Sequence, residues 1–288
     1  RSRRRAHAES TMGTPGAPPC SFFARGACRN GDACRFSHAV AAPAGVGPPG
    51  FIASQPPAQA APPPTAVNLP PGAPVYSIDV ECVATGVQHH DRAVAQISLV
   101  DAQCNPILNL YVRPDKPVVS YLTPLTGMTQ EHLDAQGTDF ASAVQTLRSQ
   151  LPPSSVLVGQ NILKDVEWLG LVRGTDFADM VDLSALLRCW NSRFNSYSYF
   201  SQDHYAGVWL GNARTEADAH DAVADAILSM RLFGAYTSVQ HDPAAVAAMA
   251  AKVIAVKPKP SFAVLNPTFE GCCMGNRKTC KCGAPFFS

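Results

Sequence analysis

Several features that would define common protein classes are missing from this 288-residue chain. No apolar run approaches the roughly 18 residues that a transmembrane helix needs, which excludes a membrane-spanning protein. The arginines of the RSRRR start are not followed by an apolar segment, so no secretory signal peptide is evident. The chain also lacks the low hydrophobicity that is typical of disordered proteins. Because 46% of its residues are hydrophobic and 16% are charged, a wholly disordered chain is excluded. The chain starts at Arg1 and not at Met, as a fragment of a longer protein would.

Charge is distributed very unevenly along the chain. Residues 1–38 hold seven arginines against two acidic residues, and residues 39–74 hold no charged residue at all. Residues 75–235 hold eighteen acidic and ten basic residues, whereas residues 236–288 hold six basic and two acidic ones. An acidic centre between basic ends suits a site that gathers carboxylates while its flanks attract a polyanion. Chance unevenness is the alternative interpretation.

These shifts in composition predict four regions. We expect a basic N-terminus over residues 1–38 and a spacer rich in Pro, Ala and Gly over residues 39–74. We expect one α/β domain over residues 75–236 and a basic, cysteine-containing tail over residues 237–288. About 160 residues suffice for a single core of this kind.

The central domain begins with strand patterns and continues with strands and helices in alternation. Strands are expected at 75–80, 93–100 and 107–112, as an antiparallel meander. A strand at 156–159 and a short apolar piece at 180–181 follow, and helices are expected at 140–151, 162–172 and 216–236. The inner stripe expected for the last helix is Ala219, Val223, Ala226, Ile227, Met230 and Phe233. This order predicts a mixed sheet flanked by helices.

The ten cysteines lie mainly near the two ends. Only Cys82, Cys104 and Cys189 belong to the central region, and they are far apart in the sequence. Clusters at the ends of such a chain favour metal ligands over disulfides and suggest an intracellular protein, nuclear or cytoplasmic.

A metal-binding pattern occupies residues 20–38, with the spacing Cys20-x7-Cys28-x5-Cys34-x3-His38. Three thiolates and one imidazole complete a tetrahedral shell for a structural Zn²⁺, without which so short a segment has almost no core. The segment resembles the CCCH zinc fingers, many of which bind single-stranded RNA and some of which dock proteins. The resemblance, together with the physics of base stacking, implies RNA contacts from a set of aromatic and basic side chains: Phe22, Arg25, Arg29, Arg35 and Phe36.

Carboxylates form a second pattern in the central region. Asp79 and Glu81 stand at i and i+2 of an expected strand and therefore share one face. Asp165 follows a Gly-Gln-Asn turn just inside an expected helix, and His220 and Asp225 lie on the last one. Acidic groups gathered this closely need a positive partner, for which a pair of divalent metal ions is the natural choice.

This set resembles the DEDDh exonucleases, which have an RNase H-like fold. The resemblance implies two Mg²⁺ or Mn²⁺ ions and the release of nucleoside 5′-monophosphates from 3′ ends. It assigns Asp79, Glu81, Asp165 and Asp225 to the metals and His220 to the attacking water. Stretches 111–114, 118–123 and 126–129 resemble the Rex-type RNA exonucleases and the poly(A) nuclease, with Gln160 where that group often has His. Single-stranded RNA is the expected substrate.

Several alternatives stay open. The acidic residues could form a solvated face, because spacing alone does not distinguish Asp225 from Asp221. His89–Asp91 together with His220–Asp221 could belong to a His-Asp phosphohydrolase, although the first group falls in a polar turn. The fold could also serve DNA, or act without catalysis as an RNA-binding adaptor.

Four thiols are gathered in the tail. They could bind a second Zn²⁺, form a regulatory thiol pair or belong to a docking tail: Cys272, Cys273, Cys280 and Cys282.

Overall fold

The computed structural model of the chain describes residues 66–86, 91–212, 219–260, 268–269 and 272–273. The expected zinc finger, with its RNA-contacting side chains, and most of the expected spacer lie outside these residues. So do His89, His90, Cys280 and Cys282.

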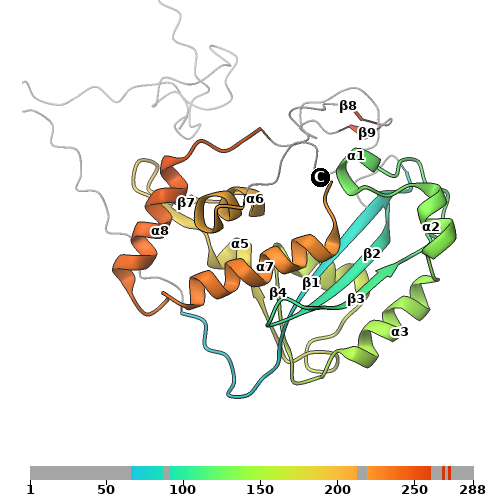
Figure 1. Cartoon of the computed structure of the whole chain (residues 1–288), viewed down its shortest axis with the longest axis horizontal. Helices are drawn as coiled ribbons and strands as arrows, with labels where there is room; N and C mark the ends of the chain where they lie inside the picture. Colours follow the sequence, from blue (N-terminus) through green and yellow to red (C-terminus); the bar gives the residue numbers. More distant parts are fainter. Residues whose placement is uncertain (1–65, 87–90, 213–218, 261–267, 270–271, 274–288) are drawn as a thin grey trace, which may run out of the picture. The chain divides into compact units, whose positions relative to one another are not determined.

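The elements run in an order close to the expected one (Figure 1). The strands are β1 (Val75–Ala84), β2 (Arg92–Asp101), β3 (Pro106–Tyr111), β4 (Val156–Gly159), β5 (Asp179–Asp182), β6 (Cys189–Asn191), β7 (Ser196–Ser198), β8 (Thr268–Phe269) and β9 (Cys272–Cys273). The α-helices are α1 (Thr123–Thr126), α2 (Gln130–Gln136), α3 (Phe140–Gln150), α4 (Leu163–Leu169), α5 (Leu183–Leu186), α6 (Gln202–Tyr205), α7 (Ala222–Thr237) and α8 (Pro243–Ala255), and a π-helical turn, η3 (Ala206–Leu210), follows α6.

Five strands form one mixed sheet in the order β3-β2-β1-β4-β5. The first three pair antiparallel as a meander, and β4 and β5 continue the sheet in parallel from β1. The predicted mixed sheet flanked by helices is thereby confirmed. Gly159 ends β4 where only glycine fits, because a Cβ there would lie 2.9 Å from the carbonyl oxygen of Ile78.

The two faces of β1 have different surroundings. Ile78, Val80 and Cys82 are buried in a core that α3 and α4 complete. Asp79 and Glu81 alternate with them and point to the opposite face, against which α7 packs. In Figure 1, α7 crosses the sheet on the side away from α3. The strand therefore places apolar side chains in one layer and carboxylates in the other.

The predicted start of the last helix was wrong. We expected a helix from residue 216, but α7 begins at Ala222, and His220 precedes it. Asp221 is the cause: its carboxylate accepts hydrogen bonds from the backbone N–H groups of Val223 and Ala224 and so caps the helix.

The expected single inner stripe of α7 was also incomplete. Ala219 lies before the helix, and Val223 and Ile227 are only partly buried. Leu228 and Leu232 are buried instead, because a second core of α5, α6, η3 and α8 side chains covers the other side of α7. The helix is enclosed on more than one side.

Packing extends beyond the expected limits of the central domain at both ends. Val67 contacts the second core, and its N–H donates to the side chain of Gln240 at 2.7 Å. In α8, Val253 is fully buried. Among the described helices, none has the length and apolarity required to cross a bilayer.

Candidate active site

Strand pairing orients the carboxylates of β1. In the antiparallel register Asp79 is opposite Ser98 and Glu81 is opposite Gln96, so each pair shares a face of the sheet. The hydroxyl of Ser98 donates to the carbonyl of Ala222, the first residue of α7. All four side chains therefore face the beginning of α7.

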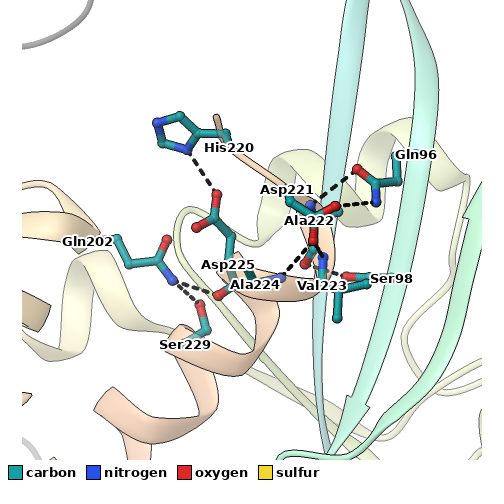
Figure 2. Close-up of polar contacts among 10 residues, drawn as sticks. All are labelled: Gln96, Ser98, Gln202, His220, Asp221, Ala222, Val223, Ala224, Asp225 and Ser229. Carbon is teal, nitrogen blue, oxygen red and sulfur yellow. Dashed lines mark hydrogen bonds and ion pairs between the residues drawn. The ribbon is translucent and has the colours of Figure 1, made fainter. Parts of the chain in front are cut away.

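A buried amide connects the sheet to this helix end. Gln96 is 1% exposed, and its Oε1 accepts a hydrogen bond from the N–H of Ala222 at 3.2 Å. Its Nε2 donates to Asp221 Oδ2 at 2.9 Å and to Asn109 Oδ1 at 3.0 Å. Figure 2 shows Gln96 and Ser98 reaching from the strand to the first residues of α7. Both carboxylate oxygens of Asp221 thus accept hydrogen bonds that fix the start of α7.

Asp225, one turn into α7, belongs to a different cluster. Ligand atoms of Glu81, His220 and Asp225 lie within 4.8 Å of one another. His220 Nδ1 is 2.9 Å from Asp225 Oδ2 (Figure 2). The backbone N–H of His220 donates to the carbonyl of Leu125. The structure therefore brings Asp225, and not Asp221, to the carboxylate of Glu81.

Asp165 comes from the other side of β1. After β4, Asn161 adopts a left-handed conformation with φ of 57°, which Asn tolerates better than most residues, and α4 then begins. Asp165 lies in the first turn of α4 and is 6% exposed. Burial raises the pKa of its carboxyl group well above the usual value, and the neighbouring Glu81 and Asp182 carboxylates raise it further.

Asp182 was not singled out from the sequence. Its Oδ1 accepts hydrogen bonds from Asn161 N–H at 2.9 Å and Ser184 N–H at 2.8 Å, which joins the turn before α4 to the start of α5. The carboxylate thus holds in place the turn that precedes α4, the helix that carries Asp165.

The other side of α7 is held by Gln202 of α6. Its Nε2 donates to the carbonyl of Asp225 at 2.7 Å and to Ser229 Oγ at 2.9 Å. Gln96 and Gln202 therefore bind the same helical turn from opposite sides (Figure 2). Neither Gln96 nor Gln202 was singled out from the sequence. The sequence signal for Gln96 is that it is a polar residue within the largely apolar strand β2.

The chemistry of this donor set fits a divalent cation. Oxygen ligands from carboxylates are those that Mg²⁺ and Mn²⁺ prefer. A buried carboxyl group whose pKa is raised by like charges would regain its ionised form beside a cation. Of the residues expected as ligands, Glu81 and Asp225 lie together with His220, Asp165 neighbours Glu81, and Asp79 shares the strand face of Glu81.

Comparison with known proteins identifies the family. The exonuclease family matches residues 76–233, and this chain belongs to it. The C-x8-C-x5-C-x3-H zinc-finger family matches residues 15–40, although seven residues, not eight, separate Cys20 from Cys28. Both resemblances noted from the sequence are confirmed. Membership implies a divalent metal at the carboxylates, and the finger implies zinc.

Two curated proteins of the nuclease class are similar to this chain over part of their length. Small RNA degrading nuclease 3 of Arabidopsis thaliana is 27% identical over 54% of this chain and 19% of its own. RNA exonuclease 4 of Gibberella zeae is 29% identical over 56% of this chain and 49% of its own. The chain thus spans at most about half the length of these relatives.

Solved structures show the same fold. The Pan2 pseudoubiquitin hydrolase–RNA exonuclease module of Saccharomyces cerevisiae, in complex with AAGGAA RNA, matches with a TM-score of 0.54 and 18% identity. The match covers 64% of this chain and 32% of that one. The Pan2 catalytic unit of Neurospora crassa matches with a TM-score of 0.52 over 68% of this chain and 32% of its own, also at 18% identity.

Proposed function

We propose that this chain is a metal-dependent 3′→5′ exonuclease that acts on single-stranded RNA ends and releases nucleoside 5′-monophosphates. The observation that carries the proposal is the convergence of Glu81, His220 and Asp225 within 4.8 Å. Asp165 supports it, because burial raises the pKa of this carboxyl group and the neighbouring carboxylates of Glu81 and Asp182 raise it further, as is typical of groups at functional sites.

Two divalent ions would stabilise the negative charge that develops when water displaces the leaving oxygen from the phosphodiester. Asp79, Glu81 and Asp225 would hold one ion, and Asp79 and Asp165 would hold or orient the other. The Gln96 and Gln202 amides fix the helical turn that carries Asp225, so that this carboxylate is positioned before substrate arrives.

His220 would accept the proton of the attacking water. An ionised carboxylate can only accept a hydrogen bond, so a neutral His220 donates its Nδ1–H to Asp225 Oδ2. In this tautomer Nε2 is the ring nitrogen that can accept a proton. The side chain of His220 is 37% exposed and that of Asp225 is 5% exposed. These values suit a general base that water can reach and a buried metal ligand.

RNA is the preferred substrate for two reasons. The relatives named above are RNA exonucleases or degrade small RNA, and the finger family supports RNA binding. The same five residues would serve DNA equally well, so a competition between RNA and DNA oligomers of one sequence tests the preference. Faster or equal loss of the DNA would overturn it.

The polarity of cleavage has its own test. The full chain is incubated with Mg²⁺ or Mn²⁺ and one RNA carrying its label at either end. With the label at the 3′ end, we expect a labelled mononucleotide from the first turnover; with the label at the 5′ end, we expect a ladder of shortening products. Early release of a labelled mononucleotide from the 5′ end would contradict the proposal.

A further inference from the structure

An aromatic, basic segment follows α5. Residues 187–201 hold β6, β7 and the turn between them, and we call this segment the aromatic hairpin. It contains two arginines, five aromatic residues and no acidic residue, within a region that has eighteen acidic residues against ten basic ones. Its charge is thus opposite in sign to that of its surroundings.

Part of the hairpin is a rigid stack. Trp190 and Tyr197 are directly paired across the two strands, and their rings meet edge to face with centroids 5.2 Å apart. The guanidinium carbon of Arg188 lies over the Tyr197 ring, 4.2 Å from its centroid. Edge-to-face aromatic pairs and cation–π contacts of this kind hold the two strands together without a large core.

The rest of the hairpin exposes aromatic rings to solvent. Phe194 is 66% exposed and Tyr199 is 62% exposed, which makes them the two most exposed large hydrophobic side chains in the described part of the chain. Arg193 lies over the ring of Phe194, with its guanidinium carbon 5.4 Å from the ring centroid. Exposed rings beside guanidinium groups are the surface on which unpaired bases stack while phosphates meet positive charge.

The hairpin is tied to the candidate active site through its C-terminal end. Tyr199 precedes Gln202 by three residues, so their Cα atoms are at most about 11 Å apart. Gln202 donates to the carbonyl of Asp225 at 2.7 Å. Figure 2 shows this side chain reaching from its helix to α7. The residue that directly follows the hairpin therefore contacts the turn of α7 that carries Asp225.

We propose that the aromatic hairpin binds the single-stranded RNA upstream of the end that is being cleaved. Bases stack on Phe194 and Tyr199, and Arg188 and Arg193 attract the phosphates. The proposal rests on the function proposed above and adds a substrate-binding surface to it. The charge of the hairpin, the exposure of its rings and its tie to Asp225 favour RNA over a protein as the occupant.

The test compares two pairs of substitutions in the full chain. Phe194→Ala with Tyr199→Ala removes the exposed rings of the hairpin, and Phe140→Ala with Val172→Ala removes exposed apolar side chains elsewhere. Each variant is assayed on an unstructured RNA of about 20 nucleotides, long enough to cover a typical single-strand binding site, and on a trinucleotide. The assays are repeated with Cys28→Ser present, so that the finger does not mask the hairpin.

We expect KM for the long RNA to rise about tenfold or more in the hairpin variant, since the loss of two stacked bases together removes at least that factor. Its kcat and its kinetics on the trinucleotide stay unchanged, as do all values for the control variant. Arg193→Gln should lower the salt dependence of RNA binding by about 0.7 in the slope of log K against log salt. An unchanged KM with an active enzyme would overturn the hairpin proposal and leave the proposed function standing.

Failure of the function itself would look different. If the wild-type chain shortens no RNA, its affinity for the same long RNA is measured by fluorescence anisotropy. A loss of affinity in the hairpin variant alone would then support the surface and reject the exonuclease. Equal affinity in all variants would reject the surface, and a protein-docking role for the exposed rings would replace it.

Discussion

The side-chain amide of Gln96 meets the carboxylate of Asp221 at 2.9 Å, across the gap between strand β2 and the start of α7. The same amide accepts from the N–H of Ala222, so one buried side chain holds the cap of α7 and its first residue. His220 immediately precedes this point, and Asp225 is one turn beyond it. The geometry of the candidate site therefore depends on a residue that is not part of it.

Replacing Gln96 with leucine should reduce both stability and turnover. Gln96→Leu leaves the N–H of Ala222 and one oxygen of Asp221 without this partner, which costs about 1–3 kcal/mol in the free energy of unfolding. We expect kcat to fall while KM changes little, because the turn that carries Asp225 is less well fixed.

Gln103→Leu, in the exposed turn after β2, is the matched control and should change neither quantity. Urea unfolding and steady-state kinetics measure both effects. A Gln96→Leu chain with wild-type kcat would show that the amide serves stability alone.

The zinc finger should act as a tether. Because Val67 packs against the second core, a flexible spacer would comprise the 28 residues 39–66, with a root-mean-square reach of about 26–32 Å. Cys28→Ser should unfold the finger and raise KM for long RNA, because RNA held at one end raises the local concentration of its 3′ end. An RNA too short to bridge both sites should be cleaved as before. Equal effects on long and short RNA, or none, would favour a protein-docking role for the finger.

His220→Ala should have the opposite kinetic signature. Loss of the group that accepts the proton of water removes an interaction made in the transition state, so kcat falls on long and short RNA alike, by a factor of about 10²–10⁴. His204→Ala is no suitable control, because the His204 ring is buried against Val253. His132→Ala, on α2, is the better comparison and should retain most of the activity.

Much of the fold follows from local patterns. The alternation in residues 75–80 and 93–100 predicts paired strands, and in β1 it places Asp79 and Glu81 on the face opposite the core. The short apolar run at 156–159 coincides with β4. Such signals are local, and the register between the strands then follows from which side chains must be buried.

Other features depend on contacts distant in sequence. Apolar periodicity continues through residues 219–221, so it cannot show that Asp221 caps α7 and excludes His220 from the helix. Helix α8 is rich in alanine and has no strong stripe, yet Val253 is fully buried against the second core. Gln96 and Gln202 gain their roles only when β2 and α6 meet α7. Tertiary structure supplies that information.

The direct test of the carboxylate site compares two acidic residues of α4. Asp165 is buried beside Glu81 and Asp182, whereas the side chain of Glu167 is 53% exposed and pairs with Lys164. In EDTA, Asp165→Asn should unfold at a temperature about 2–4 °C above wild type, because it removes a carboxyl group that is unfavourable to bury beside other carboxylates, which stabilises the fold by about 1 kcal/mol. Glu167→Gln should leave the unfolding temperature nearly unchanged.

The decisive measurement is the shortening of 5′-labelled single-stranded RNA by these two variants and wild type, with Mg²⁺, with Mn²⁺ and with EDTA. The account predicts a 3′-shortening ladder for wild type and Glu167→Gln with either metal, and no ladder in EDTA. It predicts no ladder for Asp165→Asn with either metal, although this variant is folded and more stable. A ladder from Asp165→Asn equal to that of wild type, or no ladder from any chain with either metal, would contradict it.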